Sequence, residues 1–239
     1  MIHFISDLHL NEDEPATVQA FFDFLAGPAR AGEALWILGD LFNFWAGDDE
    51  LRSPFNARIA EALADLHAAG TRIYLLVGNR DFMLGKKFAE RTGMEIVTEP
   101  VRIDLGGHAT LLAHGDAQCT DDIAYQRFRK KVRSPLWQKV FLTLPLFVRH
   151  RIVKGVKSKS KASKQTKDMR IMDVNDDAIA ESFRASATEW MIHGHTHRPA
   201  THAITVDGIE RVRHVLPDWH GKACGLLWDG QNMLTFGQD

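Results

Sequence analysis

The segment IHFISDLH, residues 2–9, joins a short apolar run to two side chains that commonly bind metal ions, Asp7 and His9. A nearly continuous apolar run predicts a strand that is buried on both faces, as in a parallel sheet. Ligands bind just beyond the carboxyl ends of such strands. The segment therefore predicts a buried strand that delivers an aspartate and a histidine to a binding cleft.

The same arrangement occurs four more times along the chain. Apolar runs precede the motifs Gly39-Asp40, Gly78-Asn79-Arg80-Asp81, His114-Gly115-Asp116 and Gly194-His195-Thr196-His197. One such motif alone usually marks only a turn with a capped helix. Five in order, most of them directly after a predicted strand, indicate one metal site. The candidate ligands are Asp7, His9, Asp40, Asn79, His114, His195 and His197.

The types of these ligands restrict the metal and its chemistry. Carboxylate and amide oxygens with imidazoles, and no thiolate, suit Mn, Fe, Co or Zn. The set exceeds the four ligands of a tetrahedral ion, and it matches two ions that share a bridging carboxylate. Two ions about 3.5–4 Å apart stabilise the attacking and leaving oxygens of an in-line displacement at phosphorus. The predicted reaction is metal-assisted hydrolysis of a phosphoester or phosphoanhydride.

The order of the motifs, D-x-H, G-D, G-N-[HR]-D, H-G-D and G-H-x-H, resembles that of the calcineurin-like metallophosphoesterases. More closely, the chain is similar to the UDP-2,3-diacylglucosamine pyrophosphatases of lipid A biosynthesis, from Ile2 to about Trp219. The segments that carry this similarity are residues 5–13, 38–49, 78–82, 114–128 and 171–175. The resemblance implies an α/β fold, a two-sheet β-sandwich flanked by helices. It also implies one domain, residues 1–239, with a helical lid insertion at about 120–185.

A reaction and a cofactor also follow from the resemblance. It implies one Mn²⁺ on Asp7, His9, Asp40 and His197 and a second on Asp40, Asn79, His114 and His195. Asp40 would bridge the two ions. A bridging hydroxide would attack the UMP-side phosphorus of UDP-2,3-diacylglucosamine, releasing UMP and 2,3-diacylglucosamine 1-phosphate (lipid X). Asp40 and Arg80 are the expected catalytic residues.

Two positions differ from the wider superfamily. Arg80 stands where most members carry a histidine that acts as a general acid. Arginine stays protonated, so it cannot donate a proton, but it forms bidentate bonds to phosphate oxygens. This change suits a pyrophosphate, whose sugar phosphate leaves without protonation; an ion pair with Asp81 is the structural alternative. Asn43 stands where many members carry an acid. It is expected to lie behind the metal ligands, where asparagine can still orient a histidine, and its role is left open.

The resemblance further implies a set of contacts to the substrate. Lys164 and Lys167 would supply charge for the phosphates, and Ser160 would supply a hydrogen bond. Asp122 would contact a glucosamine hydroxyl or amide. A solvated surface run is the alternative for the two lysines. The complete set is Asn79, Arg80, Asp122, Ser160, Lys164, Lys167 and His195, with Tyr125 nearby.

Composition places the chain among ordinary globular proteins. A length of 239 residues with 45% apolar content allows a substantial core in one domain. We expect no signal peptide and no spanning helix, because no uncharged run approaches about 18 residues. Cys119 and Cys224 match no metal or redox spacing, so reduced thiols in a cytosolic protein are expected. Asp207-Gly208 and Asp229-Gly230 predict hairpin turns.

Charge is distributed unevenly along the chain. Residues 127–170 hold 15 Lys and Arg against one acid, although the net charge is −2. The same stretch carries an apolar patch from Leu136 to Val148, interrupted at Pro145. Apolar side chains beside clustered cations predict peripheral contact with an anionic membrane, on the cytoplasmic side of the inner membrane. A lid core with a phosphate-binding rim is the equal alternative.

Two other functions fit the residues less well. A nuclease would use the basic segment to follow nucleic acid, but the apolar patch and Arg80 suit an amphiphilic pyrophosphate better. No nucleic-acid partner is therefore expected. A non-enzymatic module without metals would not need every ligand position filled. The sequence does not determine the oligomeric state.

Overall fold

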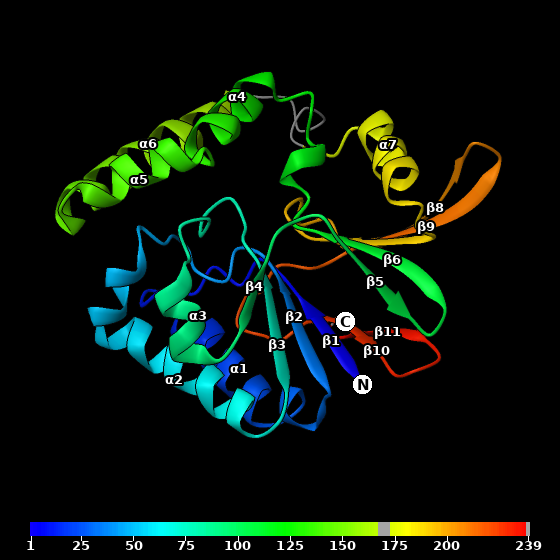
Figure 1. The fold of residues 1–239 in the computed structure, drawn as a ribbon, viewed down its shortest axis with the longest axis horizontal. Helices are drawn as coiled ribbons and strands as arrows, with labels where there is room; N and C mark the ends of the chain where they lie inside the picture. The colour runs from blue at the N-terminus through cyan, green and yellow to red at the C-terminus, as the bar shows by residue number, and fades with distance from the viewer. Residues whose placement is uncertain (167–172, 238–239) are drawn as a thin grey trace.

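Two β-sheets pack against each other at the centre of the molecule (Figure 1). The computed structural model describes residues 1–166 and 173–237, without the side chains of residues 159–166. The first sheet has the strand order β11-β10-β1-β2-β3-β4, and its four strands β1 to β4 are parallel. The strands of this sheet are β1 (Ile2–Ile5), β2 (Ala34–Leu38), β3 (Arg72–Leu76), β4 (Glu95–Val97), β10 (Gly225–Trp228) and β11 (Met233–Phe236).

The second sheet has the strand order β5-β6-β7-β9-β8. Its strands are β5 (Val101–Leu105), β6 (His108–Ala113), β7 (Trp190–His193), β8 (Ala200–Val206) and β9 (Ile209–Val215). β6, β7 and β9 run parallel, so their carboxyl ends meet at one edge. The predicted turn at Asp207-Gly208 joins β8 to β9 with both residues at positive φ, as a type I′ hairpin requires.

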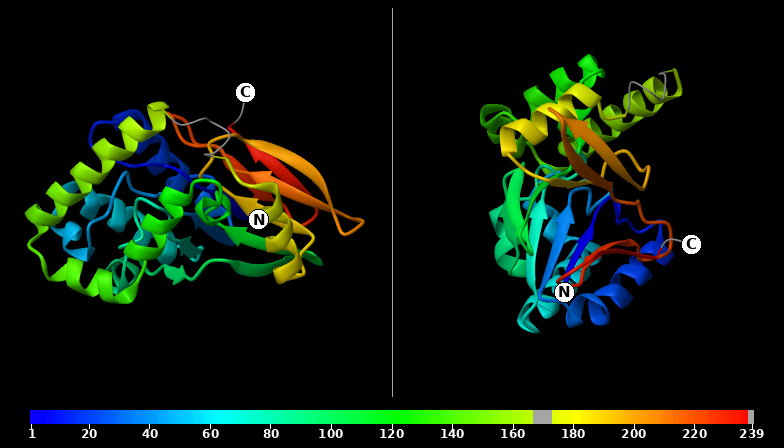
Figure 2. Two further views of the ribbon diagram at one scale, coloured as in Figure 1. Left: turned by 90° about the horizontal axis from the view of Figure 1, so that it is seen from above. Right: turned by 90° about the vertical axis from the view of Figure 1, so that its right-hand side faces the viewer.

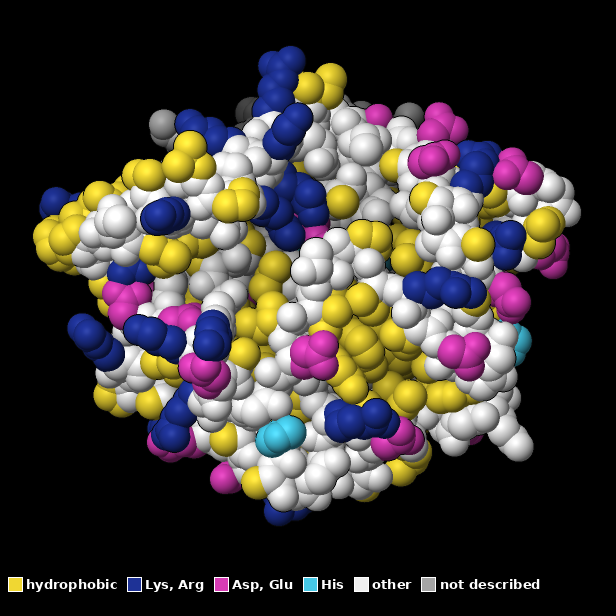
Figure 3. Space-filling model, in the orientation of Figure 1, with side chains coloured by type: hydrophobic (Ala, Val, Ile, Leu, Met, Phe, Trp, Pro, Cys, Tyr) yellow, Lys and Arg dark blue, Asp and Glu magenta, His cyan; other side chains and the backbone are white. Residues whose placement is uncertain are grey.

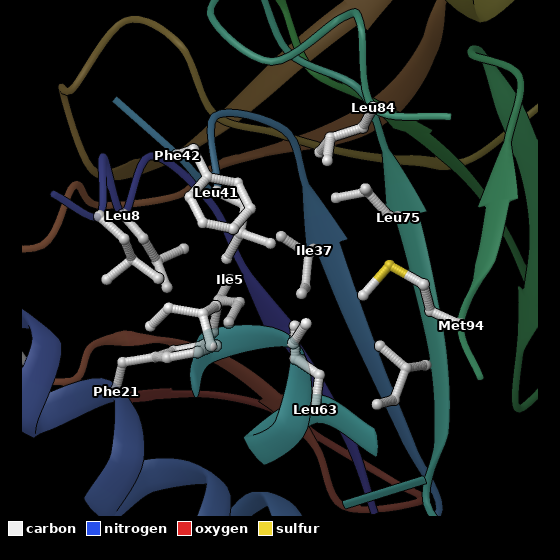
Figure 4. Close-up of a cluster of buried hydrophobic side chains, with 14 of the residues drawn as sticks. Ile5, Leu8, Phe21, Ile37, Leu41, Phe42, Leu63, Leu75, Leu84 and Met94 are labelled. Atoms are coloured by element: carbon white, nitrogen blue, oxygen red, sulfur yellow. The ribbon is translucent and has the colours of Figure 1, made fainter. Parts of the chain in front are cut away.

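Apolar side chains cover both faces of the first sheet. Phe4 and Trp36 pack against Leu112 and Ile192 of the second sheet. The opposite face is covered by α1 (Pro15–Ala26), α2 (Pro54–Ala68) and α3 (Lys86–Thr92). Figure 4 shows part of that layer, with Phe21 and Leu63 against Ile5, Ile37 and Leu75. The five apolar runs are therefore strands β1, β2, β3, β6 and β7, as predicted, and the two-sheet α/β sandwich is confirmed.

Among the described residues, four α-helices separate β6 from β7. They are α4 (Ile123–Val132), α5 (Pro135–Thr143), α6 (Leu146–Thr166) and α7 (Asp176–Ser186). The view from above shows α4 with α5, and α6, as two arms that diverge from the turn at Leu144 and Pro145 (Figure 2). α7 lies on the outer face of the second sheet, where Ile179 and Phe183 pack on Met191. In the described part of the chain, no helix is long and apolar enough to cross a bilayer.

Cations of the predicted insertion attach its helices to the two-sheet body. Arg129 of α4 and Arg133, the residue that follows α4, both pair with Asp116 and Glu99. Arg149 of α6 is only 3% exposed, donates to the carbonyl of Ala46 and pairs with Asp49. These three arginines belong to the basic run of residues 127–170, so part of that run neutralises the body's own acids. These three arginines are therefore not available to an anionic partner, whereas the prediction that the basic segment faces such a partner stays untested for its other cations.

The apolar patch of the insertion is divided between core and surface. Phe141 is buried in the main core, with Trp137 stacked on it at 4.7 Å between ring centroids. Leu136, Val140 and Phe147 are instead 75%, 58% and 67% exposed. Yellow side chains accordingly gather over α5 and α6 in the space-filling view (Figure 3). Phe141 and Trp137 thus belong to a core, as one alternative expects, whereas contact of the exposed residues with a membrane stays a prediction.

Removing the buried guanidinium of Arg149 should loosen α6 from the body. Arg149→Ala leaves the Asp49 carboxylate and the Ala46 carbonyl without their donor, a loss of about 1.5–3 kcal/mol for bonds to a charged group. We expect a lower urea midpoint with the fold retained. Arg151→Ala, which removes an exposed arginine two residues further along α6, is the matched control. Equal midpoints for the two variants would contradict this role of Arg149.

Candidate metal centre

The ends of five strands place the candidate ligands at one edge of the two sheets. Asp7 and His9 follow β1, Asp40 follows β2, Asn79 follows β3, His114 follows β6, and His195 and His197 follow β7. Five of these residues have positive φ, between 50° and 69°: Asp7, His9, Asp40, His195 and His197. Such backbone geometry is costly for residues other than glycine and concentrates at functional sites. The strand exits are therefore bent specifically to turn these side chains toward one another.

Buried carboxylates hold the bent loops together. Asp81 accepts hydrogen bonds from the backbone N–H of Leu41 at 2.7 Å and of Gly78 at 2.7 Å. This joins the loop after β2 to the loop after β3. Asp7 accepts from the Ser6 hydroxyl at 2.7 Å and from the His195 N–H at 2.8 Å, which joins β1 to β7. The ligands are thus positioned by hydrogen bonds between loops that are far apart in sequence.

Two glycines allow the close approach of these loops. A Cβ at Gly78 would lie 2.1 Å from Asp40 Oδ1, and one at Gly194 would lie 2.3 Å from Asp7 Oδ2. The Cβ at Gly78 would also meet the backbone N of Asp40 at 2.4 Å, and the one at Gly194 would meet the Ser6 hydroxyl oxygen at 2.1 Å. The glycines of the sequence motifs are therefore required by packing around the two aspartates rather than by the turn alone.

One group of donor atoms consists of Asp7, His9 and His197. His197 Nε2 lies 3.2 Å from Asp7 Oδ1 and 3.4 Å from His9 Nε2. His9 Nε2 is 3.9 Å from the same carboxylate oxygen. Three donor atoms directed at one small volume are suited to a single cation.

A second group consists of Asp7, Asp40 and His114, all fully buried or nearly so. His114 Nε2 lies 3.7 Å from Asp40 Oδ1 and 3.1 Å from Asn79 Oδ1. The His195 ring is 5.0 Å from the His114 ring, centroid to centroid. Asp40 also reaches the first group, because its Oδ2 is 3.8 Å from His9 Nδ1. The structure therefore brings all seven candidate ligands into one cluster.

Electrostatics in the cluster favour a cation. Burial raises the pKa of Asp40 to about 7, and the carboxylates of Asp81 and Asp7 act in the same direction. Burial would lower the pKa of His114, but Asp40 and Asp7 raise it to about 9. Burial would likewise lower the pKa of His197, which hydrogen bonds to Asp218 and Asp7 raise to about 10. A carboxylate cluster this deep in the protein needs positive charge.

The cluster fits a divalent centre on its own chemistry. His9 Nδ1 is buried without a hydrogen-bond partner among the described residues, although Asp40 Oδ2 lies nearby. A buried ring nitrogen in this position is explained by a ligand that the protein itself does not supply. Metal ligands must lose their protons, so an ion would displace protons from His114 and His197, and its affinity would rise with pH.

Residues behind the ligands fix their orientation, and the sequence did not identify them. His114 Nδ1 donates to the Leu38 carbonyl at 2.8 Å, which directs Nε2 toward the cluster. His197 Nδ1 lies 2.8 Å from Asp218 Oδ2. Asp218 comes three residues after β9 ends, at the carboxyl end of another parallel strand. That position is the signal that could have revealed it.

Arg80 lies beside the cluster rather than in a surface ion pair with Asp81. Its Nε is 3.5 Å from Asp40 Oδ2, and its backbone N–H donates to Asp40 Oδ1 at 2.8 Å. Lys157 of α6 lies close enough to Arg80 to have its pKa lowered, first by burial and then by that charge. Asn43 accepts a hydrogen bond from Lys157 Nζ at 2.9 Å. In the described contacts Asn43 thus supports α6 through Lys157.

The remaining predicted substrate residues are only partly described. Asp122 caps α4 by accepting from the Tyr125 N–H at 3.0 Å. Tyr125 donates its hydroxyl to Asp116 at 2.6 Å, with its ring stacked 6.2 Å from that of His195. Ser160 and Lys164 lie in α6, where the side chains are not described, and Lys167 lies outside the described residues. Their substrate contacts stay predictions.

Comparison with known proteins agrees with this geometry. The chain belongs to the calcineurin-like phosphoesterase family, whose model matches residues 1–199. A UDP-2,3-diacylglucosamine hydrolase of Aromatoleum aromaticum is 50% identical over 95% of this chain and 92% of its own length. Relatives of the same name from Proteus mirabilis and Salmonella typhi are 48% and 46% identical, over 91% and 98% of this chain and 90% and 98% of theirs. The predicted family is confirmed, and with it the prediction of a metal-dependent hydrolase.

Asp218 should control metal affinity through His197. Asp218→Ala removes the acceptor at His197 Nδ1, and losses of such partners typically weaken metal binding about 10–100-fold. We expect a larger Mn²⁺ dissociation constant by titration calorimetry, with circular dichroism unchanged. His220→Ala removes an exposed histidine that also pairs with Asp218 and serves as the control. An Asp218→Ala protein with native Mn²⁺ affinity would rule out this orienting role.

Proposed function

We propose that the protein hydrolyses the pyrophosphate bond of UDP-2,3-diacylglucosamine to 2,3-diacylglucosamine 1-phosphate and UMP, a step of lipid A biosynthesis. The observation that carries the proposal is the cluster of seven oxygen and nitrogen donors with Arg80 at its edge. Relatives named UDP-2,3-diacylglucosamine hydrolase match nearly the whole chain, which supports the choice of this substrate.

Two divalent ions, with Mn²⁺ as the expected metal, would occupy the cluster. The expected division gives Asp7, His9, Asp40 and His197 to one ion and Asp40, Asn79, His114 and His195 to the other. Asp7 belongs to both groups of donor atoms in the structure, so its carboxylate would be available to either ion, as that of Asp40 would be. When bound, the pair would supply a hydroxide nucleophile and would neutralise charge that develops on the phosphate.

The protein's own residues would position the pyrophosphate. Arg80 stays protonated and presents a planar set of donors to phosphate oxygens. Its Nε is buried without a hydrogen-bond partner among the described residues, 3.5 Å from Asp40 Oδ2, which leaves it available to a ligand. Lys157, beside Arg80, adds a second charge from α6. Arg80 lies at the edge of the cluster and Lys157 faces it from α6, so the phosphates would enter beside these two cations.

The exposed apolar side chains of α5 and α6 support contact with lipid. Eight of the large apolar residues that are exposed lie in α4, α5 and α6: Ile123, Phe128, Leu136, Val140, Leu142, Phe147, Ile152 and Val156. Such a surface, beside lysines and arginines, suits acyl chains and an anionic membrane. Peripheral binding to the cytoplasmic side of the inner membrane is part of this proposal.

Product analysis of an Asp40 variant tests the reaction directly. With Mn²⁺ and UDP-2,3-diacylglucosamine, the native protein should yield UMP and 2,3-diacylglucosamine 1-phosphate by mass spectrometry. Asp40→Ala should abolish turnover, because the second group of donors loses a carboxylate and His9 of the first group loses the carboxylate beside it, while Asp65→Ala on the exposed side of α2 should not. Absence of both products with the native protein would refute the proposal.

Arg80 can be tested by restoring the histidine of the wider superfamily. Arg80→His removes the bidentate phosphate contact, and loss of one such electrostatic donor typically slows turnover about 10²-fold. We expect that decrease on the UDP-lipid, together with a relative gain on phosphoesters that have poor leaving groups. An unchanged rate on the UDP-lipid would exclude Arg80 from phosphate binding.

If α6 contacts lipid, a negative charge introduced on its exposed apolar surface should weaken that contact. Phe147→Glu should reduce binding to anionic vesicles and hydrolysis of the diacylated substrate, because a large apolar side chain contributes about 1.5–3 kcal/mol when buried. Hydrolysis of a water-soluble nucleotide diphosphate should change little. Ile209→Glu, at an exposed position on β9, is the control. Equal effects on both substrates would argue against lipid contact at Phe147.

A further inference from the structure

A cavity of about 230 Å³ adjoins the metal centre on the outer face of the second sheet. Ala200 and His202 of β8 and Arg213 of β9 line it, together with Thr196 and Arg198 of the loop after β7. Thr196 lies between the ligands His195 and His197, so its Cα is only about 3.8 Å from the Cα of each. The cavity therefore opens from the same loop that carries two of the candidate ligands.

Arg213 gives the cavity an unusual donor. The residue is 9% exposed, and in the described part of the chain its only hydrogen-bond partner is His193 Nε2, 3.0 Å from Nη1. No carboxylate of the described residues lies within ion-pair distance of it. Guanidinium groups carry five N–H donors, and buried ones are normally paired with an anion. The remaining N–H groups of Arg213 are available to an acceptor in the cavity.

The other lining groups determine what kind of ligand would match. Asp173 offers a carboxylate that is held by Arg198, and Thr196 offers a hydroxyl. Burial lowers the pKa of His202, so its imidazole is neutral at neutral pH. A carboxylate next to a neutral imidazole disfavours a phosphate group. A pyrimidine base, by contrast, presents carbonyl acceptors to Arg213 and an N–H donor to Asp173 or Thr196.

Size and position agree with a base. The cavity is smaller than the roughly 300–1,000 Å³ of complete small-molecule sites, so it would hold one part of a larger ligand. In Figure 1, β8 and β9 lie on the right of the molecule, and α5 and α6 lie on the left. A substrate with its phosphates at the metal centre could thus extend its lipid toward the insertion and its nucleoside toward β8.

We propose that this cavity is the subsite for the uracil base of the nucleotide half of the substrate, with Arg213 as the donor to a base carbonyl. The inference rests on the proposed function. It assigns a binding site to the nucleoside, for which the sequence analysis named no contact residue. It concerns ground-state recognition of the base and requires no additional chemical step.

Binding of UMP and ribose 5-phosphate to the Mn²⁺-loaded protein separates base from phosphate. We expect calorimetry to show UMP bound at least about tenfold more tightly, a difference of about 1.4 kcal/mol. Ala200→Phe should fill the cavity and reduce this preference to less than about twofold. Ala203→Phe places the same substitution on the same strand, but on its opposite face, and should leave the preference intact.

A second variant tests the subsite independently, in case the phenyl ring introduced at position 200 points into solvent and leaves the cavity open. Arg213→Met keeps an unbranched side chain without N–H donors and should also abolish the preference for UMP. Equal binding of UMP and ribose 5-phosphate to the native protein would overturn the subsite. So would a full preference for UMP in either folded variant. Hydrolysis of UDP-2,3-diacylglucosamine by the native protein is measured separately, so failure of the proposed function is distinguished from failure of the subsite.

Discussion

Two carboxylates with almost no solvent contact, Asp7 and Asp40, impose the main constraint on this protein. Isolated charges are costly in a protein interior, so each must be hydrogen-bonded or paired with a cation. The structure meets that need with backbone and hydroxyl donors from distant loops, such as Ser6 and His195 for Asp7 and Arg80 for Asp40. The positive φ values and the glycines at the strand exits follow from bringing those donors within reach. The remaining demand for positive charge is what makes the site a metal centre.

Local sequence was enough to predict the strands and the clustering of the candidate ligands. Strands β1, β2, β3, β6 and β7 are apolar runs because both faces of each are covered, and residues that follow such strands meet at one edge. The hairpin at Asp207-Gly208 was equally predictable, because two consecutive residues at positive φ favour that dipeptide. The features that carry these predictions lie within a few residues of one another.

Features that depend on distant partners could not be predicted in this way. Asp218 orients His197, but the two meet only because β9 lies beside β7 in the second sheet. The basic run of residues 127–170 gave no indication that Arg129 and Arg149 would be paired with acids of the body. Phe141 and Val140 are adjacent in an apolar helix, yet one is buried and the other exposed. Charge counts and apolar counts describe a segment, whereas pairing and burial depend on what the fold places beside it.

The attachment of the helical insertion has a mechanical consequence. Its first arm is tied through Arg133 to the carbonyl of Gly78, next to Asn79 and Arg80. Its second arm is tied through Arg149 and Lys157 to the loop that follows Asp40. Because both arms are anchored, the helices cannot move away from the body without displacing the loops that hold the candidate ligands. The turn at Leu144 and Pro145 between the two arms is held as well, because Phe141 is buried in the main core and Arg149 donates to the Leu144 carbonyl. The helices are therefore fastened to the body at several points along their length, which couples their position to that of the loops after Asp40 and before Asn79.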